Sequence, residues 1–144
     1  MKFRKVLCAG TFDHYHIGHQ FYLWQGITMA QAMVVIVARD RTVCDIKNHC
    51  AENREENRKQ RIEEDFLHPS IRDTYSIAPI IRLGRSDKDF YQTIKEEDPD
   101  LIFLGYDQRF DEKKAHETFP HITFKRCGPY FPEIFKSSYF RDKG

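Results

Sequence analysis

The chain of 144 residues is long enough for one α/β domain with a substantial core, and no linker or internal repeat divides residues 1–144. Its formal net charge of +1 provides no general positive field, which argues against nucleic acid as a partner. No apolar run approaches the roughly 20 residues of a membrane span, and the N-terminus has no signal-peptide core, so we expect a cytoplasmic protein without a membrane partner.

The predicted elements alternate between strand and helix along the chain. Short apolar runs predict five strands, at Val6–Ala9, Met33–Ala38, Thr74–Leu83, Leu101–Leu104 and Ile122–Lys125. The predicted helices are Gln20–Ala30, Glu52–Leu67, Asp87–Glu97 with Asp87 as N-cap, Phe110–Phe119 and Lys136–Arg141. The polar stretch Arg39–Ala51 is predicted as a loop. This alternation predicts an α/β fold with a doubly wound parallel sheet of five strands.

The cysteines show no C-x-x-C pairing. They are Cys8, Cys44, Cys50 and Cys127, and Cys8 lies in the first predicted strand. In a protein expected in the cytoplasm, we predict that they are reduced thiols and form neither a disulfide framework nor a zinc site.

The segment Gly10–His19 (G-T-F-D-H-Y-H-I-G-H) joins the first predicted strand to the first predicted helix. Backbone N–H groups and the positive end of the helix dipole converge there on an anion. Three residues apart, His16 and His19 can both face a bound phosphate, and imidazolium groups stabilise developing phosphoryl charge. Gly18 leaves room for a phosphate near the backbone, and Thr11 offers a hydroxyl and an N–H. Two histidines in a turn can also be metal ligands or have no function, but the whole string is far more specific than H-x-x-H.

Three polar stretches follow predicted strands at the carboxyl edge of the sheet, where ligands bind in open α/β sheets. They are Ala38-Arg39-Asp40, Gly105-Tyr106-Asp107-Gln108 and Lys136-Ser137-Ser138. Gly105 allows close backbone approach to a base or ribose, and Asp107 can accept from ribose hydroxyls or a base amine. The two serines, at a predicted helix start, can hold β- and γ-phosphates. Taken alone, each stretch is more typical of a loop or a helix cap.

Together these motifs resemble the signature of the H-x-G-H nucleotidyltransferases, a superfamily that includes cytidylyltransferases and pantetheine-phosphate adenylyltransferase. The resemblance implies a Rossmann-like sheet, attack of an acceptor phosphate on the α-phosphate of a nucleoside triphosphate, release of pyrophosphate, and Mg²⁺ bound with the triphosphate. It implies catalytic roles for His16, His19 and Lys47. It implies nucleotide binding by Gly10, Thr11, Phe12, Gly18, Arg58, Gly105, Asp107, Gln108, Ser137 and Ser138. Lys47 and Arg58 match a lysine and an arginine eleven residues apart in similar enzymes, although each could equally belong to a solvated charged face.

Within the superfamily, the chain is most similar to archaeal-type FAD synthases, which transfer AMP from ATP to FMN. The similarity rests on Val35–Asp40, Leu104–Gln108 and the serine pair. Glycerol-3-phosphate cytidylyltransferases usually have S-T-D and G-D-D at the first two places, and an arginine-containing motif near the end that is absent here. We therefore expect ATP and FMN, with CTP and a sugar or polyol phosphate as the alternative, and a homodimer as in similar enzymes.

The chain departs from similar enzymes in two places. They usually have K-G-R-x-P where this chain has Lys47–Ala51, and a threonine where it has Tyr139. The change at Tyr139 leaves open a function of another class, a nucleotide-binding module without catalysis. The intact histidine pair favours the enzyme, because a pure binder does not need both histidines.

Overall fold

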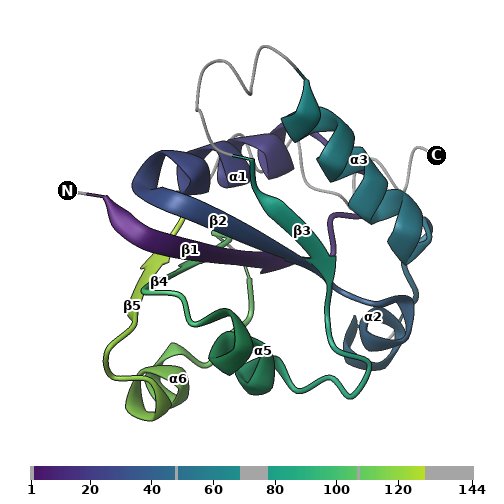
Figure 1. The fold of residues 1–144 in the computed structure, drawn as a ribbon. Helices are drawn as coiled ribbons and strands as arrows, with labels where there is room; N and C mark the ends of the chain where they lie inside the picture. The colour runs from purple at the N-terminus through teal and green to yellow at the C-terminus, as the bar shows by residue number, and fades with distance from the viewer. Residues whose placement is uncertain (1, 48, 69–77, 107, 129–144) are drawn as a thin grey trace.

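The computed structural model describes residues 2–47, 49–68, 78–106 and 108–128, and here five parallel strands form one sheet in the order β3-β2-β1-β4-β5 (Figure 1). The strands are β1 (Phe3–Gly10), β2 (Ala30–Val37), β3 (Ile80–Leu83), β4 (Leu101–Leu104) and β5 (Thr123–Arg126). The helices are α1 (Ile17–Met29), α2 (Asp40–Lys47), α3 (Glu55–Leu67), α5 (Phe90–Glu97) and α6 (Glu112–Thr118). The predicted α/β fold, a Rossmann-like sheet of five parallel strands, is confirmed. Within the described ranges, no helix is long and apolar enough to cross a membrane.

Strand β1 lies in the middle of the sheet, where Leu7 pairs in register with Val34 of β2 and Ile102 of β4. Alternate side chains of β1 enter two different cores, because successive residues of a strand point to opposite faces. Val6 and Cys8 pack with residues of α1 and α3, whereas Leu7 packs in a second core with α5. Helices α1 and α3 thus cover one face, and α5 and α6 the other (Figure 1). Burial on both faces explains why the strands are nearly continuous apolar runs.

Two helix boundaries near the predicted site differ from the sequence predictions. Helix α1 begins at Ile17, three residues before the predicted start, because His16 caps it with its ring. Helix α2 lies within Arg39–Ala51, which was predicted as a loop. Only Val43 of α2 is fully buried, so the apolar periodicity that would announce a helix is almost missing there.

The start of α5 also differs from its prediction. Its N-cap is Asp89, whose carboxylate accepts from Gln92 N at 3.0 Å, and not Asp87. The Asp87 carboxylate instead accepts from Arg85. Among the described residues of the predicted strand Thr74–Leu83, β3 is Ile80–Leu83; residues 74–77 and the predicted helix Lys136–Arg141 lie outside the described residues.

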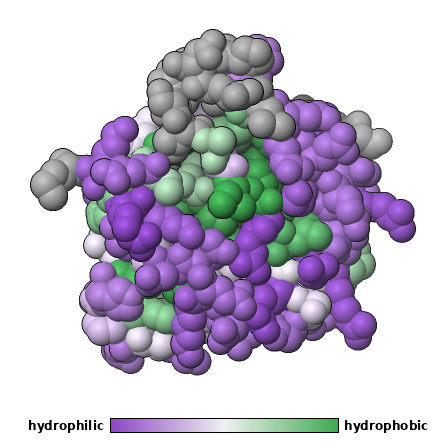
Figure 2. All heavy atoms as spheres, viewed as in Figure 1, coloured by the Kyte–Doolittle hydropathy of each residue, from purple (hydrophilic) through white to green (hydrophobic). Residues whose placement is uncertain are grey.

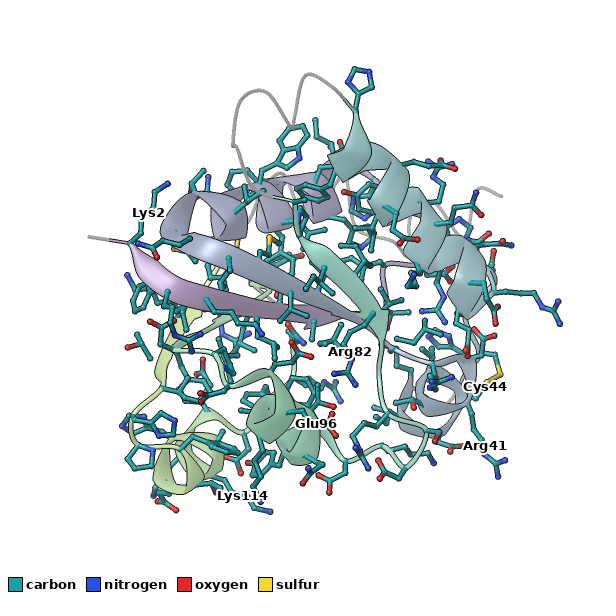
Figure 3. All side chains as sticks on the ribbon, viewed as in Figure 1. Lys2, Arg41, Cys44, Arg82, Glu96 and Lys114 are labelled. Atoms are coloured by element: carbon teal, nitrogen blue, oxygen red, sulfur yellow. A yellow bond between two sulfur atoms is a disulfide. The ribbon has the colours of Figure 1, made fainter. Side chains whose placement is uncertain are left out.

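The prediction of four reduced cysteines is wrong for two of them. Cys44 and Cys50 form a disulfide with their Cα atoms 4.1 Å apart, seen beside the label of Cys44 in Figure 3. Cys44 lies in α2, and Cys50 follows it by six positions, an approach that the loop prediction did not anticipate. Cys8 and Cys127 are free and buried, as predicted for reduced thiols.

Candidate active site

The candidate site lies at the carboxyl end of β1, where the winding of the sheet changes direction. From β1 the chain continues to β2 and β3 on one side, then crosses to β4 and β5 on the other (Figure 1). Ligands of open α/β sheets bind at such a switch point. The connection from β1 to α1, residues Thr11–His16, is called the histidine turn below. It starts where Ala38 N, beyond the end of β2, donates to Gly10 O at 2.9 Å.

His16 and His19 form the first turn of α1 together. Nδ1 of His16 accepts from Gly18 N at 3.0 Å, and Nδ1 of His19 accepts from His16 N at 3.2 Å. This is a reciprocal capping box in which imidazoles take the places that serine and glutamate usually occupy. The two rings stack with their centroids 3.9 Å apart. Helix formation itself therefore brings the predicted catalytic pair together.

Both rings have lowered pKa values, which favour the neutral form near pH 7. Burial, with a contribution from nearby His14, lowers the pKa of His16 to about 4. Burial and the neighbouring charges of His16 and Lys47 lower the pKa of His19 to about 3. Because each Nδ1 accepts a backbone hydrogen bond, each neutral ring carries its hydrogen on Nε2. The pair is thus arranged as neutral N–H donors, and the imidazolium form that the sequence suggested requires the negative charge of a bound phosphate.

The backbone of the histidine turn is strained at two residues. Phe12 and His14 have φ values of 57° and 51°, in the left-handed region that non-glycine residues rarely adopt. Between them, the carboxylate of Asp13 accepts from Glu52 N at 2.9 Å and from Asn53 N at 3.1 Å and Nδ2 at 2.8 Å. Burial raises the pKa of Asp13, but these hydrogen bonds outweigh it and hold the pKa below its ordinary value. The turn is therefore fixed from outside by the segment that leads into α3.

The predicted nucleotide contacts Gly10 and Phe12 belong together structurally. A Cβ atom at position 10 would lie 3.1 Å from the ring of Phe12, so a larger residue there would require this ring to shift. Phe12 is 3% exposed, and its ring centroid lies 5.6 Å from that of His19. Phe12 therefore forms the apolar wall behind His19. A direct contact between Phe12 and the nucleotide stays a prediction.

Tyr15 supports the same ring from another side. Its ring stacks on His19 with the centroids 5.8 Å apart, and its hydroxyl donates to Asp65 of α3 at 2.8 Å. The side-chain nitrogen of Gln20 donates to the other oxygen of Asp65 at 3.2 Å. Helix α3 thus orients Tyr15, which in turn limits the movement of the His19 ring.

Lys47 is the last residue of α2, and the structure brings its charge to the histidine pair. Its positive charge is one of the causes that lower the pKa of His19. A cation beside the pair suits the β- and γ-phosphates of a triphosphate. The catalytic role of Lys47 stays a prediction.

The side chain of Arg58 is 1% exposed and is directed into the protein. Its Nη1 donates to the carbonyls of Thr11 and Ala38, both at 2.8 Å, and its Nε donates to Asn53 O at 2.9 Å. Its Nη2 donates to Asp40 at 2.7 Å. Through these four hydrogen bonds, Arg58 connects the histidine turn, the end of β2 and the start of α3. The phosphate contact implied by the resemblance stays a prediction.

The loop after β4 is folded on itself near the same edge of the sheet. Gly105 N donates to the Gln108 side-chain oxygen at 3.0 Å, and Gln108 N donates to Gly105 O at 3.2 Å. Arg126 of β5 donates to the carbonyls of both residues at 2.7 Å. Asp107, Ser137 and Ser138 lie outside the described residues, so their predicted nucleotide contacts stay predictions.

Comparison with known proteins identifies the family to which this arrangement belongs. The sequence matches the family described as cytidylyltransferase-like over residues 7–138, from β1 to the serine pair. The chain belongs to the cytidylyltransferase-like family of nucleotidyltransferases.

Two curated relatives of this family member are FAD synthases. That of Aciduliprofundum boonei is 37% identical over 115 residues, which cover 78% of this chain and 68% of the relative. The FAD synthase of Thermoplasma acidophilum is 32% identical over 145 residues, which cover 96% of this chain and 92% of the relative. A solved structure of the lipopolysaccharide core biosynthesis protein from Thermoplasma volcanium GSS1 superposes with a TM-score of 0.74 at 28% identity, covering 89% of this chain and 98% of that one.

In this nucleotidyltransferase, sequence reasoning missed the residues that hold the histidine turn in place. The motif predicts no separate role for Asp13, although its carboxylate anchors the turn to Glu52 and Asn53. Asp65, which bonds Tyr15 and Gln20, lies in a segment so rich in both charges that no single residue stood out. The one signal in the sequence is the position of Asp13 between the aromatic residues Phe12 and His14. A carboxylate buried in such surroundings needs hydrogen-bond donors.

Proposed function

We propose that this nucleotidyltransferase transfers AMP from ATP to FMN, forming FAD and pyrophosphate. The observation that carries the proposal is the stacked pair His16 and His19, fixed as neutral Nε2–H tautomers at the N-terminus of α1 and the switch point of the sheet. The identity to FAD synthases, 37% and 32% for the two relatives above, supports ATP and FMN as the substrates.

In the proposed mechanism, a phosphate oxygen of the acceptor attacks the α-phosphorus in line. The bond from that phosphorus to the oxygen bridging the β-phosphate breaks, and pyrophosphate leaves without a covalent enzyme intermediate. His16 and His19 donate hydrogen bonds to the oxygens on which negative charge accumulates. These donors are held by helix capping before the reaction begins, so little reorganisation is needed at the transition state. Lys47 offsets the charge at the β/γ end of the triphosphate.

Magnesium enters this proposal as part of the MgATP substrate. Mg²⁺ keeps several of its waters and binds mainly through phosphate oxygens, so the protein needs no dedicated cage for it. The protein's own contribution is orientation. The positive end of the α1 dipole and the two Nε2–H groups face the triphosphate in this proposal, because His16 N and Gly18 N are already used in the capping box. The loop of Gly105 and Gln108 is the proposed place for base and ribose.

We also propose that the enzyme acts in the cytoplasm as a homodimer. Support for the dimer comes from the surface beside β3, the edge strand that among the described residues pairs only with β2. There Ile80 is 61% exposed, and Figure 2 shows apolar side chains gathered on this face over β3. An exposed apolar strand edge is a surface that proteins usually cover. Sedimentation velocity tests this interface. The wild type is expected to sediment as a dimer, and Ile80→Lys, which places a charge in the interface, as a monomer.

Pyrophosphate release tests the activity. ATP and CTP are each combined with FMN and with glycerol 3-phosphate, in the presence of magnesium. Turnover with ATP and FMN alone is expected, and it should fall by at least about a hundredfold in His16→Ala and His19→Ala. Turnover only with CTP and glycerol 3-phosphate would instead establish the cytidylyltransferase, and nucleotide binding without turnover would favour the non-catalytic module.

A further inference from the structure

The Cys44–Cys50 disulfide closes a short loop at the C-terminal end of α2. The two cysteines are six positions apart, and Lys47 lies midway between them. Cys50 is exposed and Cys44 is partly buried, so reagents in solution can reach the pair. Figure 3 shows Cys44 and its disulfide at the outer side of α2, away from the sheet. The residue that carries the cation of the site is therefore enclosed in a disulfide-closed ring.

Both ends of this ring are tied to the histidine turn. Before it, Asp40 accepts from Arg58, which also donates to the Thr11 carbonyl. After it, Glu52 N donates to Asp13, and the Glu52 carboxylate lies 2.9 Å from Nε2 of His14. Between these anchors, the disulfide removes the freedom that the loop would otherwise have. The segment that carries Lys47 is consequently joined at both ends to the histidine turn.

We propose that Cys44 and Cys50 form a thiol–disulfide site that controls how firmly Lys47 is held beside the histidine pair, and through it the affinity for the triphosphate. A cation fixed in advance loses little conformational freedom when the triphosphate binds, whereas a lysine on an open loop must be ordered on binding. The inference rests on the proposed function, because the ligand it concerns is the triphosphate of that function.

The chemistry requires a dithiol as reductant. A thiolate of the dithiol attacks one sulfur of the disulfide, the S–S bond breaks, and a mixed disulfide forms. The second thiolate of the dithiol displaces the remaining cysteine. Two electrons and two protons pass to Cys44 and Cys50, which become thiols, and the dithiol becomes a cyclic disulfide. In a cytoplasm, where thiols are generally kept reduced, a disulfide of this kind is typically transient or redox-sensing.

The other two cysteines are unsuited to this exchange. Cys8 and Cys127 are both buried in the core beside α1. Burial raises the pKa of the Cys8 thiol to about 12, which leaves almost no thiolate near neutral pH. Cys127→Ala is therefore a matched control, since it removes a cysteine without touching the ring around Lys47.

The test is calorimetric titration of the full chain with MgATP, before and after reduction with dithiothreitol. Reduction is expected to raise the Kd about tenfold, within the range that opening so short a loop allows. Cys44→Ser/Cys50→Ser should bind like the reduced wild type and should not respond to the dithiol. Cys127→Ala should respond like the wild type. Alkylation and peptide mapping establish the state of each cysteine in every sample.

A second variant isolates the part played by the lysine. In Lys47→Met, affinity is already weakened, and reduction should change it by less than about twofold. The proposal is overturned if reduction leaves the Kd of the wild type unchanged. It is also overturned if Cys44 and Cys50 are already free thiols before dithiothreitol is added, or if Lys47→Met responds to reduction as strongly as the wild type. MgATP binding without FMN turnover rejects only the acceptor, whereas no MgATP binding to the oxidised chain rejects both proposals.

Discussion

Replacing Arg58 by methionine tests whether this buried guanidinium holds the fold together. Methionine fills similar volume but cannot donate, so the carbonyls of Thr11, Ala38 and Asn53 lose hydrogen bonds of 2.8 to 2.9 Å. Each buried acceptor left unpaired costs about 1–3 kcal/mol. Asp40 is 42% exposed on its side chain and can rehydrate, so it adds little. We expect the free energy of unfolding to fall by about 3–5 kcal/mol, measured by urea denaturation followed by circular dichroism.

Two further variants make this measurement decisive. Arg61→Met removes an exposed arginine from the same helix and should change the free energy of unfolding by less than about 0.5 kcal/mol. Arg58→Lys keeps the charge but not the planar fork, so it should fall between wild type and Arg58→Met. If Arg58→Met unfolds at the same urea concentration as the wild type but binds ATP weakly, our reasoning is refuted, and Arg58 contacts the phosphates as the family resemblance implies.

Three other perturbations have expected outcomes. Asp13→Asn leaves a neutral group facing three N–H donors, so it should cost about 2–3 kcal/mol in urea unfolding and lower kcat with it. The pKa values of His16 and His19 are both lowered, so the unfolded chain binds more protons below about pH 6.5, and each histidine should lower the stability by up to about 1.4 kcal/mol per pH unit as the pH falls towards 4. His19→Asn should roughly halve this slope. A Cβ atom at Gly26 would lie 2.9 Å from Cys8 Sγ, so Gly26→Ala should lower the free energy of unfolding by about 1 kcal/mol. The double variant Cys8→Ala/Gly26→Ala should regain this stability, and thermal unfolding of both variants checks it.

The sheet was predictable because each central strand is a short, nearly continuous apolar run in the sequence. Leu101–Leu104 is observed with the bounds that its apolar run predicted, and β2 begins only three residues before its prediction. Burial on both faces leaves such strands with almost no polar residues, and the alternation with helices then restricts the possible topologies. The histidine pair was predictable for a different reason, since its spacing on a helix and its position after a strand are both local.

What the sequence did not reveal depends on contacts between distant segments. Helix α2 has one fully buried residue of its own, Val43, and its first residue, Asp40, pairs with the buried Arg58 of α3. Arg58 stands in a run of alternating charges and looks like its neighbours, yet it alone among them is fully buried. Surface ion pairs such as Arg82 with Glu96, which face each other in Figure 3, carry the same sequence signature without any such role.

The strain in the histidine turn explains why the motif alone is not a site. Left-handed backbone at a non-glycine residue costs about 1–3 kcal/mol and persists only where the surroundings enforce it. Here two such residues, Phe12 and His14, flank Asp13, whose three hydrogen bonds, together with that from Arg58 to Thr11, enforce the conformation. Protein groups alone therefore enforce the shape of the turn, which is the preorganisation that electrostatic catalysis requires. A chain that keeps the motif G-T-F-D-x-x-H-x-G-H but has no hydrogen-bond donors for Asp13 should still fold. Its two histidines should not keep the stacked arrangement of His16 and His19, and it should bind phosphate weakly.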